Sequence, residues 1–426
     1  MTFSELNLNK QLLNALADLG ISTPTVIQEK VFSVVMSGKD VCGIAQTGTG
    51  KTYAYLLPCL RQLEYSKDRN PKLLILVPTR ELVVQVLSEV KKLTKYLSLT
   101  SVGVFGGVNL KPQIAEVSEG LDILVGTPGR VVDLIATGNL RTKNIKKLVI
   151  DEFDEMLNLG FRTQLKIIFD SIPERRQNLM FSATLNEDVE ALTDIYFPNL
   201  EKVEATPNGT PLENISQTYY SVPNFYTKIN FLKLLLDQNI DMSKVLVFVS
   251  TKHLADLVYE HLSTNINNIA VIHSNKSQNH RFAVVNDFQT GACRALIATD
   301  IIARGIDVAE VTHVFNFDLP TAPEIYIHRI GRTGRKDKKG IAISFVKEDE
   351  VEKLEAIQSL MNYNIAQIPV PENLEISDKI IQEEEPIVKM KTIKLKKSTQ
   401  HVPGPAFHEK SAKNSKVNVR KPRRPR

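Results

Sequence analysis

The sequence has few cysteines and no long apolar run, and both absences exclude classes of protein. Its 426 residues include three cysteines, Cys42, Cys59 and Cys293, which are scattered without the spacing of a metal site. An odd, scattered set argues against a disulfide scaffold or a zinc finger, and it indicates a reducing compartment. The run LLILV at 73–77 is among the longest apolar stretches, far below the ~20 residues that cross a bilayer.

The N-terminus also lacks a secretion signal. The stretch MTFSELNLNKQLLNAL places acidic and polar residues where a signal peptide has an unbroken apolar core. With neither a membrane span nor a leader, a membrane protein and a secreted protein are both unexpected.

The chain is long enough for more than one domain, and its charge is unevenly divided. At roughly 100–200 residues per domain, 426 residues predict two or three domains. The formal net charge is +5, but residues 389–426 hold 13 Lys and Arg against one acid, Glu409, which is +12. The other 388 residues, with 40 basic and 47 acidic side chains, carry −7. A mildly acidic body is therefore followed by a strongly basic tail.

Short apolar runs alternate with helical patterns along the first half, which is typical of a parallel sheet covered by helices. A helix is expected at about 10–19, where leucines recur before Gly20, and another at 81–93, whose apolar residues share one face. The expected strands are 41–45, 73–77, 101–105, 123–125, 147–150 and 178–181.

The same pattern restarts after a stretch rich in turn-forming residues. ATPNGTPLENI, at 205–215, is too long for a hairpin turn and predicts an interdomain linker. Further strands are expected at 245–249, 269–272, 295–298, 314–317 and 341–345. We therefore predict domains at 1–205 and 216–370, joined by a linker at 206–215. Residues 371–426 are expected to form a flexible tail, basic from 389, whose composition predicts disorder in isolation.

The strongest local signal is AQTGTGKT at 45–52, which follows an expected strand and opens a helical stretch. In that context the backbone N–H groups of a glycine-rich turn and a helix N-terminus bind phosphate. Lys51 would reach the β- and γ-phosphates, and Thr52 would bind Mg²⁺. The strict pattern has glycine where this chain has Ala45. The alternative interpretation is a strand-to-helix turn with a chance Gly-Thr-Gly-Lys.

Two carboxylates of the sequence DEFD, at 151–154, come directly after the expected strand KKLVI. Beside a phosphate loop, Asp151 would hold Mg²⁺ through its water shell, and Glu152 would position and polarise the attacking water. By itself, an acidic turn after a strand is commonly a solvated loop or a helix cap. The phosphate loop about 100 residues earlier favours the catalytic interpretation.

Arginines spaced by three occur in HRIGRTGR at 328–335, and taken alone they could form a solvated helical face. Two further polar segments, SAT at 182–184 and TDIIARGID at 299–307, also follow expected strands. Open α/β sheets bind ligands at the carboxyl ends of their strands. Such segments in both halves therefore favour a ligand site built from two domains.

Over about residues 1–370 the chain resembles the DEAD-box ATP-dependent RNA helicases of superfamily 2, because the order and spacing of these motifs match that family. The resemblance implies two tandem RecA-like α/β domains, and it makes Ala45 the expected start of the phosphate loop. ATP and Mg²⁺ are the implied cofactors, with Thr52 and Asp151 on the metal. The implied nucleotide-binding residues are Phe3, Gln28, Gln46, Thr47, Gly48, Thr49, Gly50, Lys51, Thr52, Gly305, Asp307, Arg332 and Arg335.

Individual roles come from the same resemblance. Gln28 in GISTPTVIQ would read the adenine edge, and Asp307 would touch the ribose. Arg332 and Arg335 would act as arginine fingers on the γ-phosphate. The implied catalytic residues are Glu152, Asp151, Lys51, Arg332 and Arg335. The residues implied to couple nucleotide state to RNA grip are Asp154, Ser182, Thr184 and His328.

RNA is the implied partner, gripped by its sugar–phosphate backbone with little sequence specificity. The implied RNA-binding residues are Pro78, Thr79, Arg80, Gly106, Gly107, Thr127, Pro128, Gly129, Arg130, Thr251, Gln278, Arg281, Thr299 and Asp300. The basic tail is expected to add a salt-sensitive anchor to RNA, unless it is only a solubilising extension. Protein cofactors are a further expectation, and the missing targeting signals and the implied substrate predict a cytoplasmic protein.

Two positions depart from the family pattern. Phe153 replaces the alanine of the eponymous motif, and Ser274 follows His273 where the family usually has glycine. The two carboxylates keep their places, so hydrolysis is expected to survive. A large ring beside Glu152 and Asp154 can overpack its surroundings at a cost of ~1–3 kcal/mol. The coupling of ATP to RNA is therefore the function that Phe153 is expected to affect.

The expected activity is ATP hydrolysis on RNA-induced closure of the two domains, with local separation or remodelling of RNA duplexes. Closure would bring the arginine fingers onto the γ-phosphate, where such a group contributes about 10³–10⁵ in rate. One alternative is an ATP-controlled RNA clamp or assembly platform with weak unwinding. Another is a DNA helicase or translocase of the same superfamily.

Overall fold

Residues 2–45, 49–63, 68–185, 187–205, 214–239, 242–300, 311–334 and 338–384 are described in the computed structural model. Residues Met1–Ile380 form one compact unit and Ile381–Arg426 a second, of which the 3-10 helix η3 (Gln382–Glu384) is described. Most of the expected linker, 206–213, and the basic segment from 389 lie outside the described residues. No helix in these described ranges is long and apolar enough to cross a membrane.

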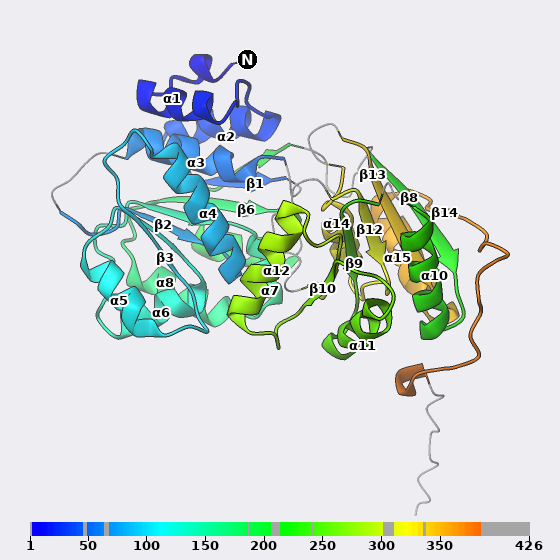
Figure 1. Ribbon diagram of the computed structural model, residues 1–426. Coiled ribbons are helices and arrows are strands. Elements are labelled where there is room, and N and C mark those ends of the chain that lie inside the picture. Colours follow the sequence, from blue (N-terminus) through cyan, green and yellow to red (C-terminus); the bar gives the residue numbers. More distant parts are fainter. Residues whose placement is uncertain are drawn as a thin grey trace, which may run out of the picture. The chain divides into compact units, whose positions relative to one another are not determined.

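The first half of the chain folds around a parallel sheet. Within the described residues, seven strands pair in the order β3-β4-β2-β5-β6-β1-β7 (Figure 1), and every pairing is parallel. The strands are β1 (Val41–Ile44), β2 (Leu73–Leu76), β3 (Ser101–Val104), β4 (Ile123–Gly126), β5 (Lys147–Ile150), β6 (Gln177–Ser182) and β7 (Glu201–Glu204). Six of them are the expected strands, and β7 is an addition at the edge.

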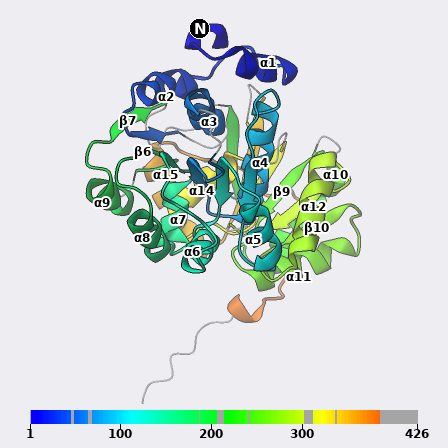
Figure 2. The same ribbon diagram turned by 90° about the vertical axis from the view of Figure 1, so that its left-hand side faces the viewer.

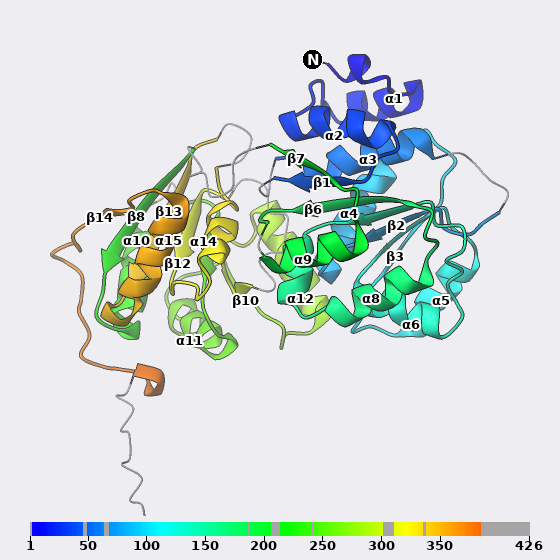
Figure 3. The ribbon, with the colours of Figure 1, turned by 180° about the vertical axis from the view of Figure 1, so that it is seen from behind.

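Helices cover both faces of this sheet. Helix α4 lies on the near face in Figure 1, and α8 and α9 lie on the near face when the molecule is seen from behind (Figure 3). The N-terminal helices α1 and α2 lie together at one end of this half (Figure 2). The helices are η1 (Phe3–Leu6), α1 (Lys10–Asp18), α2 (Val26–Met36), α3 (Lys51–Gln62), α4 (Arg80–Leu93), α5 (Leu110–Ser118), α6 (Pro128–Ala136), α7 (Phe153–Asn158), α8 (Arg162–Ser171) and α9 (Glu187–Tyr196).

Alternating side chains divide the core of this half into two layers. Leu73 and Ile75 of β2 face the layer that contains apolar residues of α2, α3 and α4. Leu74 and Leu76 face the other layer, with residues of α6, α7, α8 and α9. Successive strand residues point to opposite faces, and a parallel sheet covered on both faces needs apolar residues at every position. The run LLIL therefore forms a central strand.

The second half repeats the plan. Its strands pair in the order β10-β11-β9-β12-β13-β8-β14 over the described residues, again all parallel. The strands are β8 (Ile215–Ser221), β9 (Val245–Phe248), β10 (Ile269–Ile272), β11 (Ala295–Ala298), β12 (His313–Asn316), β13 (Gly340–Val346) and β14 (Ala366–Gln367). The helices are α10 (Phe225–Gln238), α11 (Lys252–Ser263), α12 (Gln278–Thr290), α14 (Pro323–Ile330), η2 (Glu348–Glu350) and α15 (Val351–Met361).

The prediction of two parallel-sheet α/β domains is therefore confirmed. The helices expected at 10–19 and 81–93 are α1 and α4, and the five strands expected in the second half all form. Strand order is also the same in both sheets when each half is numbered from its own first strand.

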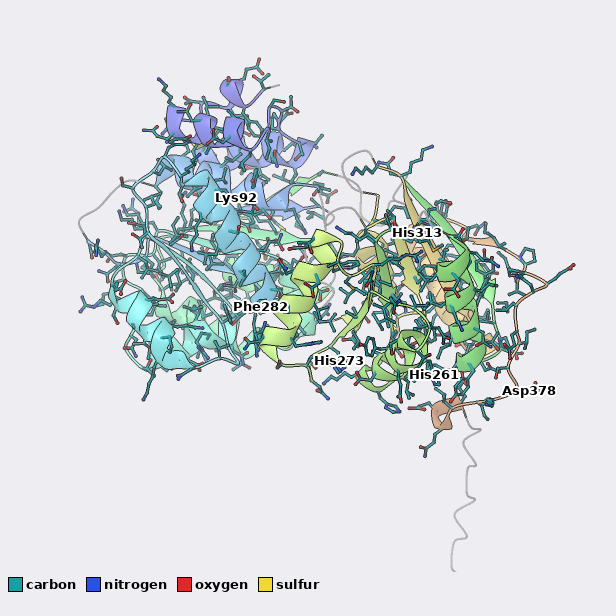
Figure 4. All side chains as sticks on the ribbon, viewed as in Figure 1. Lys92, His261, His273, Phe282, His313 and Asp378 are labelled. Atoms are coloured by element: carbon teal, nitrogen blue, oxygen red, sulfur yellow. The ribbon has the colours of Figure 1, made fainter. Side chains whose placement is uncertain are left out.

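Residues 371–380 belong to the first compact unit and are hydrogen-bonded to α10. The Ser377 N–H donates a hydrogen bond of 3.1 Å to Thr227 Oγ1, and the Asn230 amide donates one of 3.0 Å to the Glu375 carbonyl. Leu374 is buried, and Asp378 lies at this edge of the molecule (Figure 4). This part of the expected tail is thus tied to the second half by hydrogen bonds.

The strand ends place the predicted site residues. Pro78, Gly106 and Thr127 lie just beyond the carboxyl ends of β2, β3 and β4, and Asp151 directly follows β5. Thr251 and Thr299 occupy the corresponding places after β9 and β11. In an open parallel sheet this edge binds ligands, so the fold gathers the motifs of each half at one edge of its own sheet.

Candidate functional site

The phosphate loop ends at a helix whose first turn is free of a side-chain cap. Gly50 is the N-cap of α3 with φ +92°, and no side chain caps that end. The N–H groups of the first helical turn are therefore available to an anion. Lys51 begins the helix with its ammonium nitrogen buried and without a hydrogen-bond partner among the described residues. A buried cation beside open N–H groups fits a phosphate group.

Gln28 lies against this loop. Its amide nitrogen donates a hydrogen bond of 3.0 Å to the Gly50 carbonyl, and its oxygen accepts one of 3.0 Å from the Thr25 N–H. A Cβ atom at Gly50 would lie 2.4 Å from the Gln28 amide nitrogen, so this approach requires glycine. The structure therefore joins Gln28 to the phosphate loop, whereas Phe3 is buried in the core of the first half.

Asp151 is held in place from two sides. Its Oδ1 accepts a hydrogen bond of 3.0 Å from the Glu152 N–H, and its Oδ2 accepts one of 3.0 Å from the Tyr55 hydroxyl. Burial raises the pKa of Asp151, and the Lys51 charge acts in the opposite direction. Tyr55 was not among the predicted residues, although it lies one helical turn after Thr52.

The two predicted metal ligands suit an ion that arrives with a nucleotide. No group of three or more His, Cys, Asp or Glu side chains able to hold a metal occurs in the described part of the chain. Mg²⁺ is usually held by one or two protein ligands together with phosphate oxygens and water. One hydroxyl group and one carboxyl group, those of Thr52 and Asp151, are the kind of protein donors that Mg²⁺ bound with ATP would need.

Glu152 adopts an unusual backbone conformation between these groups. It is the N-cap of α7 with φ +51° and ψ +54°, in the left-handed region that few residues other than glycine occupy. Such strain commonly marks a functional position. Burial raises the pKa of Glu152 to about 8, while the charges of Lys51 and Arg332 act to lower it. A carboxyl group of that pKa is suited to exchanging a proton with water near neutral pH.

Asp154 connects three predicted coupling residues. Its Oδ2 accepts hydrogen bonds from the Thr184 N–H at 3.1 Å and the Thr184 hydroxyl at 3.0 Å, and it lies 3.8 Å from His328 Nε2. Burial would raise the pKa of Asp154, but His328, Lys51 and Thr184 outweigh it and lower that pKa. Ser182 donates a hydrogen bond of 2.7 Å to the Thr184 carbonyl. The structure thus brings Asp154, the SAT segment and His328 together.

Arg332 lies close to His328. It is buried, its Nε donates to the His328 carbonyl at 3.3 Å, and its charge influences the pKa of Glu152. A basic group from the second half therefore acts on the carboxylate that was predicted to handle water.

Phe153 is a core residue. Its side chain is 0% exposed and belongs to the core layer that also contains Met156, Met180 and Val189. The ring is accommodated there while Asp154 keeps its hydrogen bonds to Thr184. Ser274, the other departure from the family pattern, is exposed.

Predicted RNA-binding residues of the first half gather around one pocket of about 400 Å³. Its lining includes Pro78, Thr79, Arg80, Gly106, Thr127, Gly129, Arg130 and Arg281. Gly107 has φ +75°, and a Cβ atom there would lie 1.9 Å from the Arg80 guanidinium. Arg130 is buried and donates to Gln113 Oε1 and to the Val108 carbonyl, each at 2.9 Å. Arg130 therefore holds the loop that contains Gly106 and Gly107 through the Val108 carbonyl, and the Arg80 guanidinium packs against Gly107.

Helix α12 contributes to the same surface. Gln278 Oε1 accepts a hydrogen bond of 2.8 Å from Arg80 Nη1, and Gln278 Nε2 donates one of 3.0 Å to Glu81 Oε1. Arg281 pairs with the same Glu81 oxygen at 2.5 Å. Phe282, labelled in Figure 4, places its ring 6.4 Å from that of Phe105. Glu81, for which no role was predicted, holds two predicted residues of the other half.

The remaining predicted residues also have structural contacts of their own. The Thr251 hydroxyl caps α11 by accepting the Leu254 N–H at 3.2 Å. Asp300 pairs through both oxygens with Arg329, a fully buried arginine of HRIGRTGR for which no role was predicted. Pro128 begins α6, and Thr299 is buried after β11. Six predicted residues lie outside the described residues, namely Gln46, Thr47, Gly48, Gly305, Asp307 and Arg335.

The chain is similar to known proteins along most of its length. Residues 25–192 match the DEAD/DEAH box helicase family, and residues 227–337 match the helicase conserved C-terminal domain. The chain is 36% identical over 376 residues to the ATP-dependent RNA helicase FAL1 of Eremothecium gossypii. This match covers 88% of this chain and 94% of FAL1. It is 36% identical over 386 residues to the DEAD-box ATP-dependent RNA helicase CshA of Bacillus cereus, covering 90% and 73%.

Solved structures resemble the fold of both halves. S. cerevisiae Dbp5 bound to RNA and ADP BeF3 matches with a TM-score of 0.81 and 31% identity, over 86% of this chain and 95% of that one. A Dbp5 variant bound to a Gle1 variant and IP6 matches with a TM-score of 0.72 and 31% identity, over 87% and 95%. The likeness thus includes a protein solved with RNA and a nucleotide analogue.

Proposed function

The chain belongs to the DEAD-box ATP-dependent RNA helicases, and on that premise we propose how its own residues carry out the reaction. Its activity is RNA-dependent ATP hydrolysis with local separation or remodelling of RNA duplexes. The observation that carries the assignment of residues is the meeting of Lys51, Glu152 and Arg332. A buried ammonium without a hydrogen-bond partner among the described residues lies at a helix N-terminus, and its charge acts on the carboxyl group of Glu152, whose backbone is strained. An arginine from the second half acts on the same carboxyl group.

The triphosphate binds at the N-terminus of α3. The N–H groups of the first turn and Lys51 neutralise its charge. Gln28, already fixed to the Gly50 carbonyl, is positioned to read the adenine edge. Phe3, Thr49 and Gly50, together with Gln46, Thr47, Gly48, Gly305 and Asp307 of the same expected set, complete the proposed nucleotide-binding residues.

Thr52 and Asp151 would hold Mg²⁺, and the bound ion would supply positive charge to screen the phosphates. Glu152 orients the attacking water and accepts its proton, for which a pKa of about 8 is suitable. Arg332 and Arg335 stabilise the charge that develops on the γ-phosphate, and such groups contribute about 10³–10⁵ in rate. Hydrolysis is therefore fast only when the second half supplies its arginines.

RNA binds by its backbone at the pocket beside Arg80 and at the start of α12. The guanidinium groups on this surface already have partners, because Arg80 contacts Gln278 and Arg281 pairs with Glu81. RNA phosphates would therefore compete with Gln278 and Glu81 for these two arginines. Asp154, Ser182, Thr184 and His328 link this surface to the nucleotide site, because Asp154 follows the water-handling carboxylate by two residues. Phe153 leaves this link intact.

The tail and the partners are further parts of the proposal. Residues 389–426 carry +12 and add a salt-sensitive, sequence-independent attraction to RNA. A titration of RNA affinity against salt, with and without these residues, tests this, and an unchanged slope would remove the anchor. Protein cofactors are also part of the proposal, since the similar Dbp5 has been solved with a Gle1 variant. We place the protein in the cytoplasm.

The decisive experiment compares ATP hydrolysis with and without single-stranded RNA. Wild type is expected to be strongly stimulated, Glu152→Gln to bind nucleotide without hydrolysing it, and Arg332→Lys to lose most of the stimulation. Equal stimulation by DNA would identify a DNA translocase instead. ATP-dependent RNA binding without strand separation would identify a clamp. Absence of hydrolysis in wild type under every condition would refute the assignment.

A further inference from the structure

Tyr55 places a hydroxyl group in the fully buried interior directly beneath the nucleotide site. It lies on α3, one turn after Thr52, and its side chain is 0% exposed. Its hydroxyl donates a hydrogen bond of 3.0 Å to Asp151 Oδ2 and also interacts with the Thr52 hydroxyl. One hydroxyl group thus contacts both side chains assigned to Mg²⁺.

We propose that Tyr55 is a positioning residue that orients Thr52 and Asp151 for Mg²⁺ bound with the nucleotide. The proposal deepens the function proposed above and rests on it. It concerns a residue that does not touch the metal but sets the direction of the groups that do. Such outer partners commonly change metal affinity by about 10–100-fold when they are removed.

The hydrogen atoms explain how one hydroxyl can orient two ligands. A phenolic group donates one hydrogen and accepts others. Since Asp151 is an acceptor, Tyr55 donates to it, and the oxygen of Tyr55 then accepts the Thr52 hydrogen. The lone pairs of the Thr52 oxygen then remain free for a metal ion. Asp151 Oδ1 is meanwhile fixed by the Glu152 N–H at 3.0 Å, so neither carboxylate oxygen can rotate freely.

The ring of Tyr55 is fixed as firmly as its hydroxyl. It packs on Phe181 with ring centroids 5.3 Å apart. Phe181 in turn covers Gly43 of β1, where a Cβ atom would lie 2.5 Å from the ring. The glycine therefore lets Phe181 approach the sheet, and Phe181 limits the movement of Tyr55. The hydroxyl cannot leave Asp151 without disturbing this stack.

The competing interpretation is a core tyrosine whose hydroxyl merely finds a partner. Buried tyrosine hydroxyls usually do so, and in that case their removal would change stability but not the response to Mg²⁺. Tyr53 offers a matched control on the same helix. Its hydroxyl donates a hydrogen bond of 2.6 Å to Glu89, away from the nucleotide site.

The test uses the full chain with Tyr55→Phe and Tyr53→Phe, each of which removes one oxygen and keeps the ring. Binding of a fluorescent ATP analogue is measured in EDTA and across a range of Mg²⁺ concentrations. Bound Mn²⁺ is observed by electron paramagnetic resonance with the nucleotide present. Thermal unfolding without ligand reports whether each variant is folded.

For Tyr55→Phe the apparent Mg²⁺ affinity in the presence of nucleotide is expected to fall by about 10–100-fold. Binding in EDTA should match wild type, and the Mn²⁺ spectrum should change. Tyr53→Phe should follow wild type in all three measurements. A Mg²⁺ response of Tyr55→Phe equal to that of wild type overturns the proposal, as does an equal loss of binding in EDTA. If wild type itself gains nothing from Mg²⁺, the proposed function fails first.

Discussion

The Thr184 hydroxyl donates a hydrogen bond of 3.0 Å to Asp154 Oδ2, and the same oxygen accepts the N–H groups of Ala183 and Thr184 at 3.2 and 3.1 Å. The carboxylate of the DEFD turn therefore fixes the segment that follows β6. His328 Nε2 lies 3.8 Å from the same oxygen. A change of nucleotide state that moves this turn would be transmitted to both segments.

Thr184→Val keeps the volume of the side chain and removes the hydroxyl donor. A hydrogen bond to a charged group contributes about 1.5–3 kcal/mol, so RNA unwinding is expected to slow by about tenfold or more. RNA-independent ATP hydrolysis should change little, because Lys51 and Glu152 are untouched. Unwinding and hydrolysis assays on one preparation check this. Thr193→Val, whose hydroxyl bonds to the Glu190 carbonyl within α9, is the control.

Gly107→Ala is expected to weaken RNA binding by about tenfold, or ~1.4 kcal/mol. The added Cβ atom would lie 1.9 Å from the Arg80 guanidinium and would displace it. Fluorescence anisotropy with a labelled single strand measures the affinity. Gly138→Ala has a similar backbone φ of +72° but open space around it, so it isolates the cost of backbone strain. Equal RNA affinity in both variants would contradict the role of Arg80.

Phe153→Ala is expected to destabilise the first half by about 3–5 kcal/mol, because it leaves a cavity in a closed core layer. Phe153→Leu should cost less, since more of the volume stays filled. Urea unfolding measures both. RNA stimulation of ATP hydrolysis should persist in the folded variants, because Asp154 keeps its hydrogen bonds. A loss of that stimulation in Phe153→Leu would show that the ring acts on coupling after all.

A buried ionic cluster in the second half predicts a stability effect that depends on pH. Lys228 is 1% exposed and donates to Asp318 Oδ1 at 3.2 Å and to Glu350 Oε2 at 2.9 Å. Asp318 Oδ2 accepts from the Ser250 N–H and hydroxyl at 3.0 and 2.9 Å. Burial would raise the pKa of Asp318, but Lys228 and Ser250 outweigh it and lower that pKa.

Asp318→Asn is therefore expected to cost about 3–5 kcal/mol at neutral pH, since it removes one partner of a buried pair. Because the pKa of Asp318 is lowered in the folded state, its charged carboxylate stabilises the fold fully at pH values above 3.8, the ordinary pKa of aspartate. This stability is lost as the pH falls through the lowered pKa. Unfolding of wild type and variant should thus converge in acid. Asp237→Asn, an exposed change on α10, should behave as wild type throughout.

The sequence predicted the mostly apolar strands, including the edge strands β3 and β10, and missed β7, β8 and β14, for a physical reason. Central strands of a covered parallel sheet are apolar at every position, as in β2, so their runs stand out. The edge strand β7 reads EKVE and buries one side chain of four. β8, with the sequence ISQTYYS, mixes polar and aromatic residues, and β14 has two residues. Hydropathy carries little signal for such strands.

For the candidate site, the residues missed are those that position others. Glu81, Arg329 and Tyr55 had no predicted role of their own, and only the fold places them against Arg281, Asp300 and Asp151. Helical spacing offered one signal, because Tyr55 follows Thr52 by three residues and therefore shares its face. The other two pairs join segments more than 25 residues apart, which spacing cannot reveal.

The identical strand order of the two sheets has a consequence for the history of the protein. Numbered from its own first strand, each half reads 3-4-2-5-6-1-7, as duplication of a single ancestral unit would produce. The connection after β8 then corresponds to the phosphate loop after β1. It consists of residues 222–224, and the Asn224 side chain accepts the Thr227 N–H at 2.9 Å, which caps the helix end that has no side-chain cap in α3. The helix end after β1 can therefore receive an anion, whereas the equivalent end after β8 is already occupied by the Asn224 side chain.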